Sequence, residues 1–475
     1  MQKQCKSRGK NLQNQYKSHG KNLHFLKQYN NKKCGGDCML ERKITTKLLE
    51  WKKEEKKPCL LIRGARQVGK TFIIDDFAKK HYKNYIYINF ELSPEYKEIF
   101  SGNLDIRTLK MKLEVTFPDK KIEPNETILF LDEIQSCPNA RTALKSFALD
   151  GTIDVISSCS LLEIYYKEVT SYPVGYERVI DLYPLDFEEF LWGIGIKKET
   201  IDILRESFNA KKTIDDYILK QISEQFKMYM LVGGMPNIVE EYIKTSSLAN
   251  VLIMQRAIVE NYMLDVVKFA KVNEKQKIIN TFNSIPMQLS KKNKKFLYSN
   301  ITEDDENTGE RKYASAIEWL KDAGIINFCY NLSEPAAPLI SNIRLNSFKI
   351  YMRDTGLLIS MLEEGTQKAI LNDDIYINQG AILENVVASE IATRYNKLMY
   401  FERKSKLEID FILNLGGKVT AIEVKSGNNK RAKSLNSILA NYKTVTRYMK
   451  FEKDCNVYVD EKNIEHYPLF MIMFL

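Results

Sequence analysis

The sequence contains few histidines and no long apolar run, and its cysteines form no metal-binding pattern. Only four of the 475 residues are His, which argues against chemistry that needs a His triad or a His-rich metal site. The eight Cys are scattered without a C-x-x-C pair, so we expect neither a disulfide framework nor a zinc site. No apolar run approaches the roughly 20 residues of a membrane span, and the first residues lack the apolar core of a secretory signal. These absences predict a cytoplasmic protein with no membrane partner.

Positive charge is also scarce once the first residues are set aside. The formal net charge is +10, but residues 1–38 hold nine Lys or Arg and one acid, Asp37, which leaves +2 for the remaining residues. The basic composition therefore does not predict a folded body that binds nucleic acid. Residues 1–38 are rich in Gln, Asn and Lys and lack apolar periodicity, so we expect a disordered basic tail, with Met39 as an alternative start of the native protein.

The rest of the chain has the pattern of an α/β protein. In residues 39–195, continuous apolar segments alternate with helical patterns, which predicts a parallel sheet covered on both faces. Residues 196–345 are mostly helical and end in a helix, a Gly stop and a short apolar run, which is typical of a small winged-helix unit. Residues 346–475 return to an α/β pattern, and their apolar end, residues 467–475, predicts a buried strand. We predict three folded domains with these boundaries.

A glycine-rich segment stands between an apolar run and a helical pattern. It fits G-x-x-x-x-G-K-[ST] at every fixed position and consists of Gly64, Ala65, Arg66, Gln67, Val68, Gly69, Lys70 and Thr71. A loop between a strand and a helix turns its N–H groups and the helix N-terminus toward the phosphates of a nucleotide. Lys70 would reach the β- and γ-phosphates, and the Thr71 hydroxyl would hold Mg²⁺. The segment predicts a phosphate-binding loop.

Two adjacent carboxylates end a later apolar run at residues 129–131. Asp132 would bind Mg²⁺, directly or through water, and Glu133 would polarise the attacking water. An Asp-Glu pair can also merely cap a strand or start a helix, but beside a phosphate loop we favour catalysis. Ser160, after the next apolar run, is our preferred contact of the γ-phosphate, although a Ser-rich strand exit is often only a turn. Arg141 could reach a neighbouring subunit's phosphate, although a solvated surface Arg is the more ordinary role.

Three carboxylates and a lysine near the C-terminus form a second pattern. Asp410 ends a strand segment, and Glu423 and Lys425 share one face of the strand that follows a Gly-Gly turn. Asp410 and Glu423, with Glu384 from the preceding helix, would bind Mg²⁺ or Mn²⁺, and Lys425 would polarise a water. The pattern resembles the D…(D/E)-x-K signature of the restriction-endonuclease-like, PD-(D/E)xK, fold. Glu-x-Lys on a strand is also a common cross-strand ion pair, and that fold can serve binding alone.

Several stretches together resemble a prokaryotic AAA-type ATPase fused to a C-terminal domain of unknown function. They are residues 64–71, 131–135, 171–175, 183–191, 233–236 and 348–358. The resemblance covers nearly everything after Met39 and implies binding of ATP with Mg²⁺ and ATP hydrolysis. Two departures from the family pattern, Cys159 and Glu163, lie beside Ser160.

The patterns leave three function classes open. The first is an ATPase that couples nucleotide state to a nuclease-like C-terminal domain, with DNA as substrate. The second is a nucleotide-controlled switch that binds a protein or nucleic acid without cleaving it. The third is an inactive or slow nucleotide-binding scaffold. We favour an ATPase that couples nucleotide state to the nuclease-like C-terminal domain, with the switch as the alternative, and an oligomer stays open.

Overall fold

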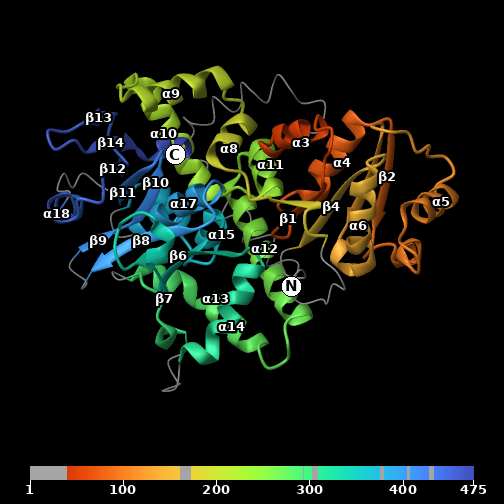
Figure 1. Ribbon diagram of the computed structural model, residues 1–475. Coiled ribbons are helices and arrows are strands. Elements are labelled where there is room, and N and C mark those ends of the chain that lie inside the picture. The colour runs from red at the N-terminus through yellow and green to blue at the C-terminus, as the bar shows by residue number, and fades with distance from the viewer. Residues whose placement is uncertain are drawn as a thin grey trace, which may run out of the picture. The chain divides into compact units, whose positions relative to one another are not determined.

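The computed structural model describes several stretches of the chain, which fold into two compact units (Figure 1). The stretches are residues 40–160, 173–291, 294–301, 309–374, 379–403, 407–426 and 433–475. Residues 41–183 and 322–324 form the N-terminal unit, and Leu40 with residues 184–321 and 325–475 forms the C-terminal unit. The predicted tail, residues 1–38, lies outside the described residues, as does Glu163.

A parallel sheet forms the centre of the N-terminal unit. Its five strands run in the order β2-β3-β4-β1-β5, and all neighbouring strands are parallel. The strands are β1 Cys59–Gly64, β2 Asn84–Asn89, β3 Thr127–Asp132, β4 Asp154–Ser160 and β5 Glu177–Asp181. Continuous apolar runs predict strands that are covered on both faces, and β1, β3 and β4 are almost entirely buried. The prediction of a parallel sheet is confirmed.

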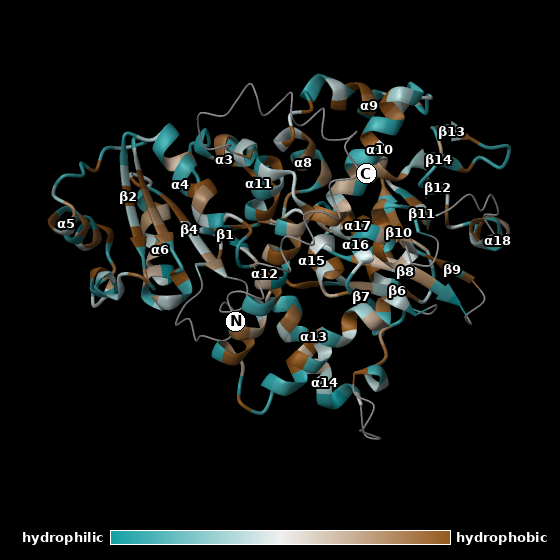
Figure 2. Cartoon of the chain, turned by 180° about the vertical axis from the view of Figure 1, so that it is seen from behind, coloured by the Kyte–Doolittle hydropathy of each residue, from teal (hydrophilic) through white to brown (hydrophobic). Residues whose placement is uncertain are grey.

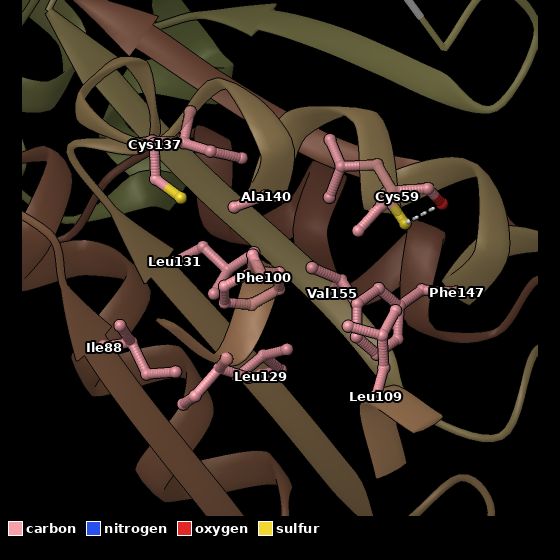
Figure 3. Close-up of a cluster of buried hydrophobic side chains, with 14 of the residues drawn as sticks. Cys59, Ile88, Phe100, Leu109, Leu129, Leu131, Cys137, Ala140, Phe147 and Val155 are labelled. Carbon is pink, nitrogen blue, oxygen red and sulfur yellow. Dashed lines mark hydrogen bonds between the residues drawn. The ribbon is translucent and has the colours of Figure 1, made fainter. Parts of the chain in front are cut away.

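Helices pack on this sheet and fix the strand that carries the predicted carboxylates. They are α3 Ile44–Lys52, α4 Lys70–His81, η1 Pro94–Phe100, α5 Ile106–Thr116, η2 Ile134–Ser136 and α6 Pro138–Asp150. Figure 3 shows a cluster of buried hydrophobic side chains, in which Leu131 of β3 lies beside Phe100 of η1, and Leu109 of α5 and Phe147 of α6 lie beside Val155 of β4. Fully burying a Leu or Phe side chain contributes about 1.5–3 kcal/mol. The cluster therefore holds the carboxyl end of β3 in place.

Helices make up the first half of the C-terminal unit, as the sequence predicts. They are α8 Phe187–Gly193, α9 Lys198–Ala210, α10 Asp216–Val232, α11 Pro236–Thr245, α12 Leu248–Phe269, α13 Lys275–Ser290, η3 Tyr298–Asn300 and α14 Glu310–Asp322. α14 buries Ala316, Ile317 and Leu320 on one face and is followed by two antiparallel strands, β6 and β7. The assignment of this part as a winged helix stays a prediction.

Two mixed sheets and their helices make up the second half. One sheet has the strand order β7-β6-β8-β9 and the other the order β10-β11-β12-β14-β13. The strands are β6 Ile326–Leu332, β7 Ile343–Met352, β8 Leu398–Arg403, β9 Leu407–Ile409, β10 Phe411–Leu415, β11 Lys418–Lys425, β12 Arg447–Glu452, β13 Tyr458–Val459 and β14 Glu465–Pro468. The helices are α15 Thr355–Ser360, α16 Thr366–Leu371, α17 Gln379–Ala392, α18 Lys433–Asn441 and η5 Leu469–Phe474. α17 packs against both β7 and β11.

One sequence-based expectation for this half is wrong. Residues 467–475 were expected to form a buried strand, and they are largely buried, but β14 ends at Pro468 and the 3₁₀ helix η5 follows it. An apolar run indicates burial and does not by itself distinguish a strand from a helical turn.

The distribution of apolar residues follows these layers. Figure 2 shows hydrophobic and hydrophilic residues alternating along a helix such as α9, whereas β1, β3 and β4 of the parallel sheet are almost entirely buried. None of the helices in the described parts of the chain combines the length and the apolar composition needed to cross a membrane.

Candidate functional site

The glycine-rich segment forms the turn between β1 and α4. β1 ends at Gly64, where a Cβ atom would lie 2.4 Å from the backbone oxygen of Leu182. α4 begins at Lys70, and its N-cap residue Gly69 has φ of +88°, a left-handed conformation that side chains disfavour. Both glycines of the motif are therefore required by the backbone. The turn leaves the first N–H groups of α4 without helical partners, as a phosphate-binding loop requires.

Lys70 lies over the loop that precedes it. Its side chain is buried, and its Nζ donates hydrogen bonds of 3.0 Å to the backbone oxygens of both Gly64 and Ala65. Burial lowers the pKa of Lys70, while the nearby carboxylates of Glu133 and Asp132 act in the opposite direction. The ammonium group is thus held between the loop and the carboxyl end of β3.

Asp132 accepts hydrogen bonds from side chains of three elements. The Thr71 hydroxyl at the start of α4 donates to Oδ2 over 3.1 Å. The Tyr87 hydroxyl and the Asn89 amide of β2 donate to the same oxygen, each over 3.0 Å. Ser158 of β4 donates to Oδ1. Sequence reasoning missed Tyr87 and Asn89, and it considered Ser158 only as one of several serines that could contact the γ-phosphate. Polar residues at the end of a strand were the available signal.

Glu133 directly follows β3 in a left-handed backbone conformation, with φ of 53° and ψ of 48°. Its Oε2 accepts a hydrogen bond of 2.6 Å from Nε2 of Gln135, which sequence reasoning also missed. Burial raises the pKa of Glu133, while the bond from Gln135 and the charge of Lys70 oppose the rise. A carboxylate with a raised pKa is suited to accept a proton from water.

The C-terminal cluster brings together the four residues that the sequence singled out. Glu384 lies on α17, Asp410 between β9 and β10, and Glu423 and Lys425 on β11. All three carboxylates are buried. Oδ2 of Asp410 accepts a hydrogen bond of 2.8 Å from the backbone N–H of Val424, and Lys425 Nζ lies 2.6 Å from Glu423 Oε1. Burial, with the charge of Glu384, raises the pKa of Asp410 to about 7.

Two further lysines, which sequence reasoning missed, lie among these carboxylates. Lys349 of β7 is 1% exposed, and its Nζ lies 3.7 Å from Glu384 Oε2 and 2.6 Å from Glu408 Oε1. Lys294 donates a hydrogen bond to the other oxygen of Glu384. In the described part of the chain, no three His, Cys, Asp or Glu side chains are placed to hold a metal ion. The divalent-cation site expected from Glu384, Asp410 and Glu423 stays a prediction, and in this arrangement Glu384 and Glu423 are paired with ammonium groups.

Three family models match the chain in succession. An AAA domain matches residues 56–191. Two domains of unknown function, DUF8612 and DUF4143, match residues 223–368 and 379–471. The chain thus carries an AAA-family P-loop ATPase domain followed by two domains of unknown function. Its phosphate loop and Asp132 both belong to the AAA domain.

The structural comparisons concern the fold alone. The Walker-type ATPase PABY2304 of Pyrococcus abyssi is 14% identical, with a TM-score of 0.42 over 68% of this chain and 96% of that one. The ORC1 protein of Aeropyrum pernix, solved in complex with DNA, is 14% identical, with a TM-score of 0.28 over 72% of this chain and 95% of that one. No curated protein matches the sequence.

Ser160 lies beside the loop of the AAA domain, at the last position of β4. It pairs with Gly64 of β1, and it is buried, with no hydrogen-bond partner for its hydroxyl among the described residues. Its neighbour Ser158 contacts Asp132 instead. The contact of Ser160 with the γ-phosphate stays a prediction, and Ser158 is placed to orient the Asp132 carboxylate.

Arg141 of the AAA domain is not a surface residue, and the solvated role expected for it is wrong. Its guanidinium is buried and donates hydrogen bonds of 3.1 and 2.8 Å to the two carboxylate oxygens of Glu177 in β5. Such a bidentate pair inside the unit ties α6 to the edge of the sheet.

Proposed function

We propose that the chain binds ATP with Mg²⁺ at the loop of residues 64–71 and hydrolyses it. The observation that supports the proposal is the contact between the Thr71 hydroxyl and Asp132, which are 61 positions apart in the sequence and lie 3.1 Å from each other. A hydroxyl and a carboxylate oxygen are the hard donors that Mg²⁺ prefers. Lys70 and Glu133 lie near this pair, so binding and catalytic groups converge at one end of β3.

Each residue has a defined part in the proposed reaction. The N–H groups of the loop and the N-terminus of α4 hold the phosphates, and Lys70 neutralises their charge. Thr71 and Asp132 would hold Mg²⁺, which supplies further charge neutralisation on the phosphate oxygens. Glu133 accepts a proton from the water that attacks the γ-phosphorus.

Two substitutions test the proposal. We expect Lys70→Ala to abolish ATP binding, measured by calorimetry, because its buried ammonium contacts the loop at the backbone oxygens of Gly64 and Ala65. We expect Glu133→Gln to bind MgATP as the wild type does while phosphate release falls at least about 100-fold. Lys79→Ala is the matched control, since this exposed lysine on α4 pairs with Asp75 of the same helix. Wild-type hydrolysis by either site variant would refute the assignment.

For the C-terminal unit we propose the switch rather than the nuclease. The cluster of Glu384, Asp410, Glu423 and Lys425 retains the side chains of a PD-(D/E)xK site. However, Lys294, Lys349 and Lys425 balance its charge, which favours recognition of a protein or nucleic acid whose binding depends on nucleotide state.

Cleavage assays separate the two readings. Full-length protein is incubated with plasmid and single-stranded DNA in Mg²⁺ or Mn²⁺, with and without ATP, beside Lys425→Ala. We expect no cleavage under any condition. Divalent-dependent cleavage that Lys425→Ala abolishes would instead establish the nuclease.

A further inference from the structure

The backbone at Glu133 is strained and at the same time firmly held. A non-glycine residue in the left-handed region costs about 1–2 kcal/mol. The turn persists because the Glu133 oxygen accepts the N–H of Ser136 over 2.9 Å, and the Ile134 oxygen accepts the N–H of Cys137 over 2.9 Å. Ile134 and Cys137 are buried in the core cluster. Strain of this kind is maintained where a side chain must be aimed in one direction.

The turn brings Gln135 back onto Glu133. Gln135 is 7% exposed, and its Nε2 donates the 2.6 Å hydrogen bond to Glu133 Oε2. Its other polar atom, Oε1, is buried and has no hydrogen-bond partner among the residues that the structure describes. An unsatisfied buried acceptor costs about 1–3 kcal/mol. Buried polar groups therefore nearly always have a hydrogen-bond partner, and Oε1 of Gln135 requires a donor.

We infer that Gln135 is a positioning residue for ATP hydrolysis, holding both the Glu133 carboxylate and the attacking water. The inference rests on the proposed ATPase function. Nε2 of Gln135 fixes one oxygen of Glu133 and leaves the other for the water. Oε1 of Gln135 accepts a hydrogen bond from the second O–H group of that water.

The step that Gln135 prepares is a balanced hydrolysis. The water oxygen forms a bond to the γ-phosphorus while the bond between that phosphorus and the bridging oxygen of ADP breaks. One water proton passes to Glu133, and the electron pair of the broken bond leaves with ADP. Gln135 exchanges no proton and acts by geometry alone, so its loss affects turnover and leaves ATP binding intact.

Two variants of Gln135 test this inference in the full-length chain. Gln135→Met keeps the length and packing of the side chain and removes both polar atoms. Gln135→Glu keeps the acceptors and removes the donor, and it places a second carboxylate beside Glu133. We expect kcat to fall at least about tenfold in both variants, while KM and the Kd for MgATP stay within about twofold of the wild type. Ser136→Ala, in the same turn, is the control and should match the wild type.

The results separate failure of this inference from failure of the ATPase assignment. If Glu133→Gln is inactive while either Gln135 variant keeps the wild-type kcat, the role of Gln135 is refuted and the ATPase stands. A raised KM or Kd without a fall in kcat would likewise refute it, because a purely structural role predicts that pattern. If Glu133→Gln hydrolyses ATP at the wild-type rate, both assignments fail.

Discussion

At the scale of single residues, the Asp132 carboxylate is oriented before any ligand arrives. Its Oδ2 accepts hydrogen bonds from Thr71, Tyr87 and Asn89, and its Oδ1 from Ser158. Hydrogen bonds to a charged group contribute more than neutral ones, about 1.5–3 kcal/mol each. Preorganisation of this kind lowers the cost of placing Mg²⁺ at the site.

Removing one of these donors should weaken the use of Mg²⁺. We expect Tyr87→Phe to raise the Mg²⁺ concentration needed for half-maximal ATP hydrolysis by on the order of three- to tenfold, because Asp132 loses one fixed donor. Titration of Mg²⁺ at saturating ATP measures the change. Tyr85→Phe is the matched control on the same strand, since the Tyr85 hydroxyl donates to Asp75 and not to Asp132. Equal Mg²⁺ curves for the two variants would contradict this view of Tyr87.

The residues that sequence reasoning found at this site differ from those that it missed in one physical respect. Lys70 and Thr71 lie within one local motif, whose spacing is set by the turn itself. Tyr87 and Ser158 reach Asp132 only because β2 and β4 pair with β3 on either side. Strand pairing across long stretches of chain leaves no local pattern in the sequence.

At the scale of elements, one buried carboxylate ties two helix ends together in the C-terminal unit. Asp354 caps α15, where its Oδ1 accepts the N–H of Leu357 over 2.9 Å, and its Oδ2 accepts the N–H of Gly234 over 2.7 Å. Gly234 belongs to the turn between α10 and α11, where a Cβ atom would lie 2.1 Å from the backbone oxygen of Leu185. The turn between α10 and α11 is thus built around Asp354.

This arrangement predicts a pH dependence of stability. Burial raises the pKa of Asp354 to about 6, above its usual range, so the folded state binds the proton more tightly than the unfolded state does. The cost of the ionised form is present above pH 6 and is relieved as the pH falls toward 4. We expect the melting temperature of the wild type, relative to that of Asp354→Asn, to be higher at pH 5 than at pH 7. The assignment would be contradicted if the Tm of the wild type minus that of Asp354→Asn were the same at both pH values or lower at pH 5.

The parallel strands were predictable because a short apolar run that is bounded by turns can adopt few conformations other than a buried strand. The end of the chain was not, since the run at residues 467–475 is equally apolar and yet follows Pro468 into a 3₁₀ helix. Proline has no N–H to continue a strand ladder, and its fixed φ suits the start of a helical turn. Burial was predicted correctly there, and conformation was not.

At the scale of the whole molecule, an AAA-family domain is joined to two domains of unknown function. Residues 184–321 and 325–475 form one compact unit, in which α10 and α12 pack against α15, and α13 packs against β7. Packing between elements so far apart in the chain has no compositional signal. The domain boundaries near residues 195 and 345 stay predictions, since they mark only where the sequence pattern changes.

The C-terminal cluster was also only partly predictable, because some of its residues come from elements far apart in the chain. The spacing of Glu423 and Lys425 on one strand, with Asp410 just before the hairpin, was sufficient to predict that these side chains converge. Lys349 and Lys294 come from other elements, and they change the charge balance on which metal binding depends. The sequence therefore indicated the place of the cluster, and the structure indicates its charge.

The central claim is that the carboxyl end of β3 and the phosphate loop form one hydrolytic site. The most direct measurement is the rate of phosphate release by Glu133→Gln relative to the wild type at saturating MgATP, with ATP affinity determined on the same preparations. We predict turnover by the wild type, a loss of at least about 100-fold in the variant and equal affinities. Equal rates in the two proteins, or a wild type that binds MgATP and releases no phosphate, would contradict it.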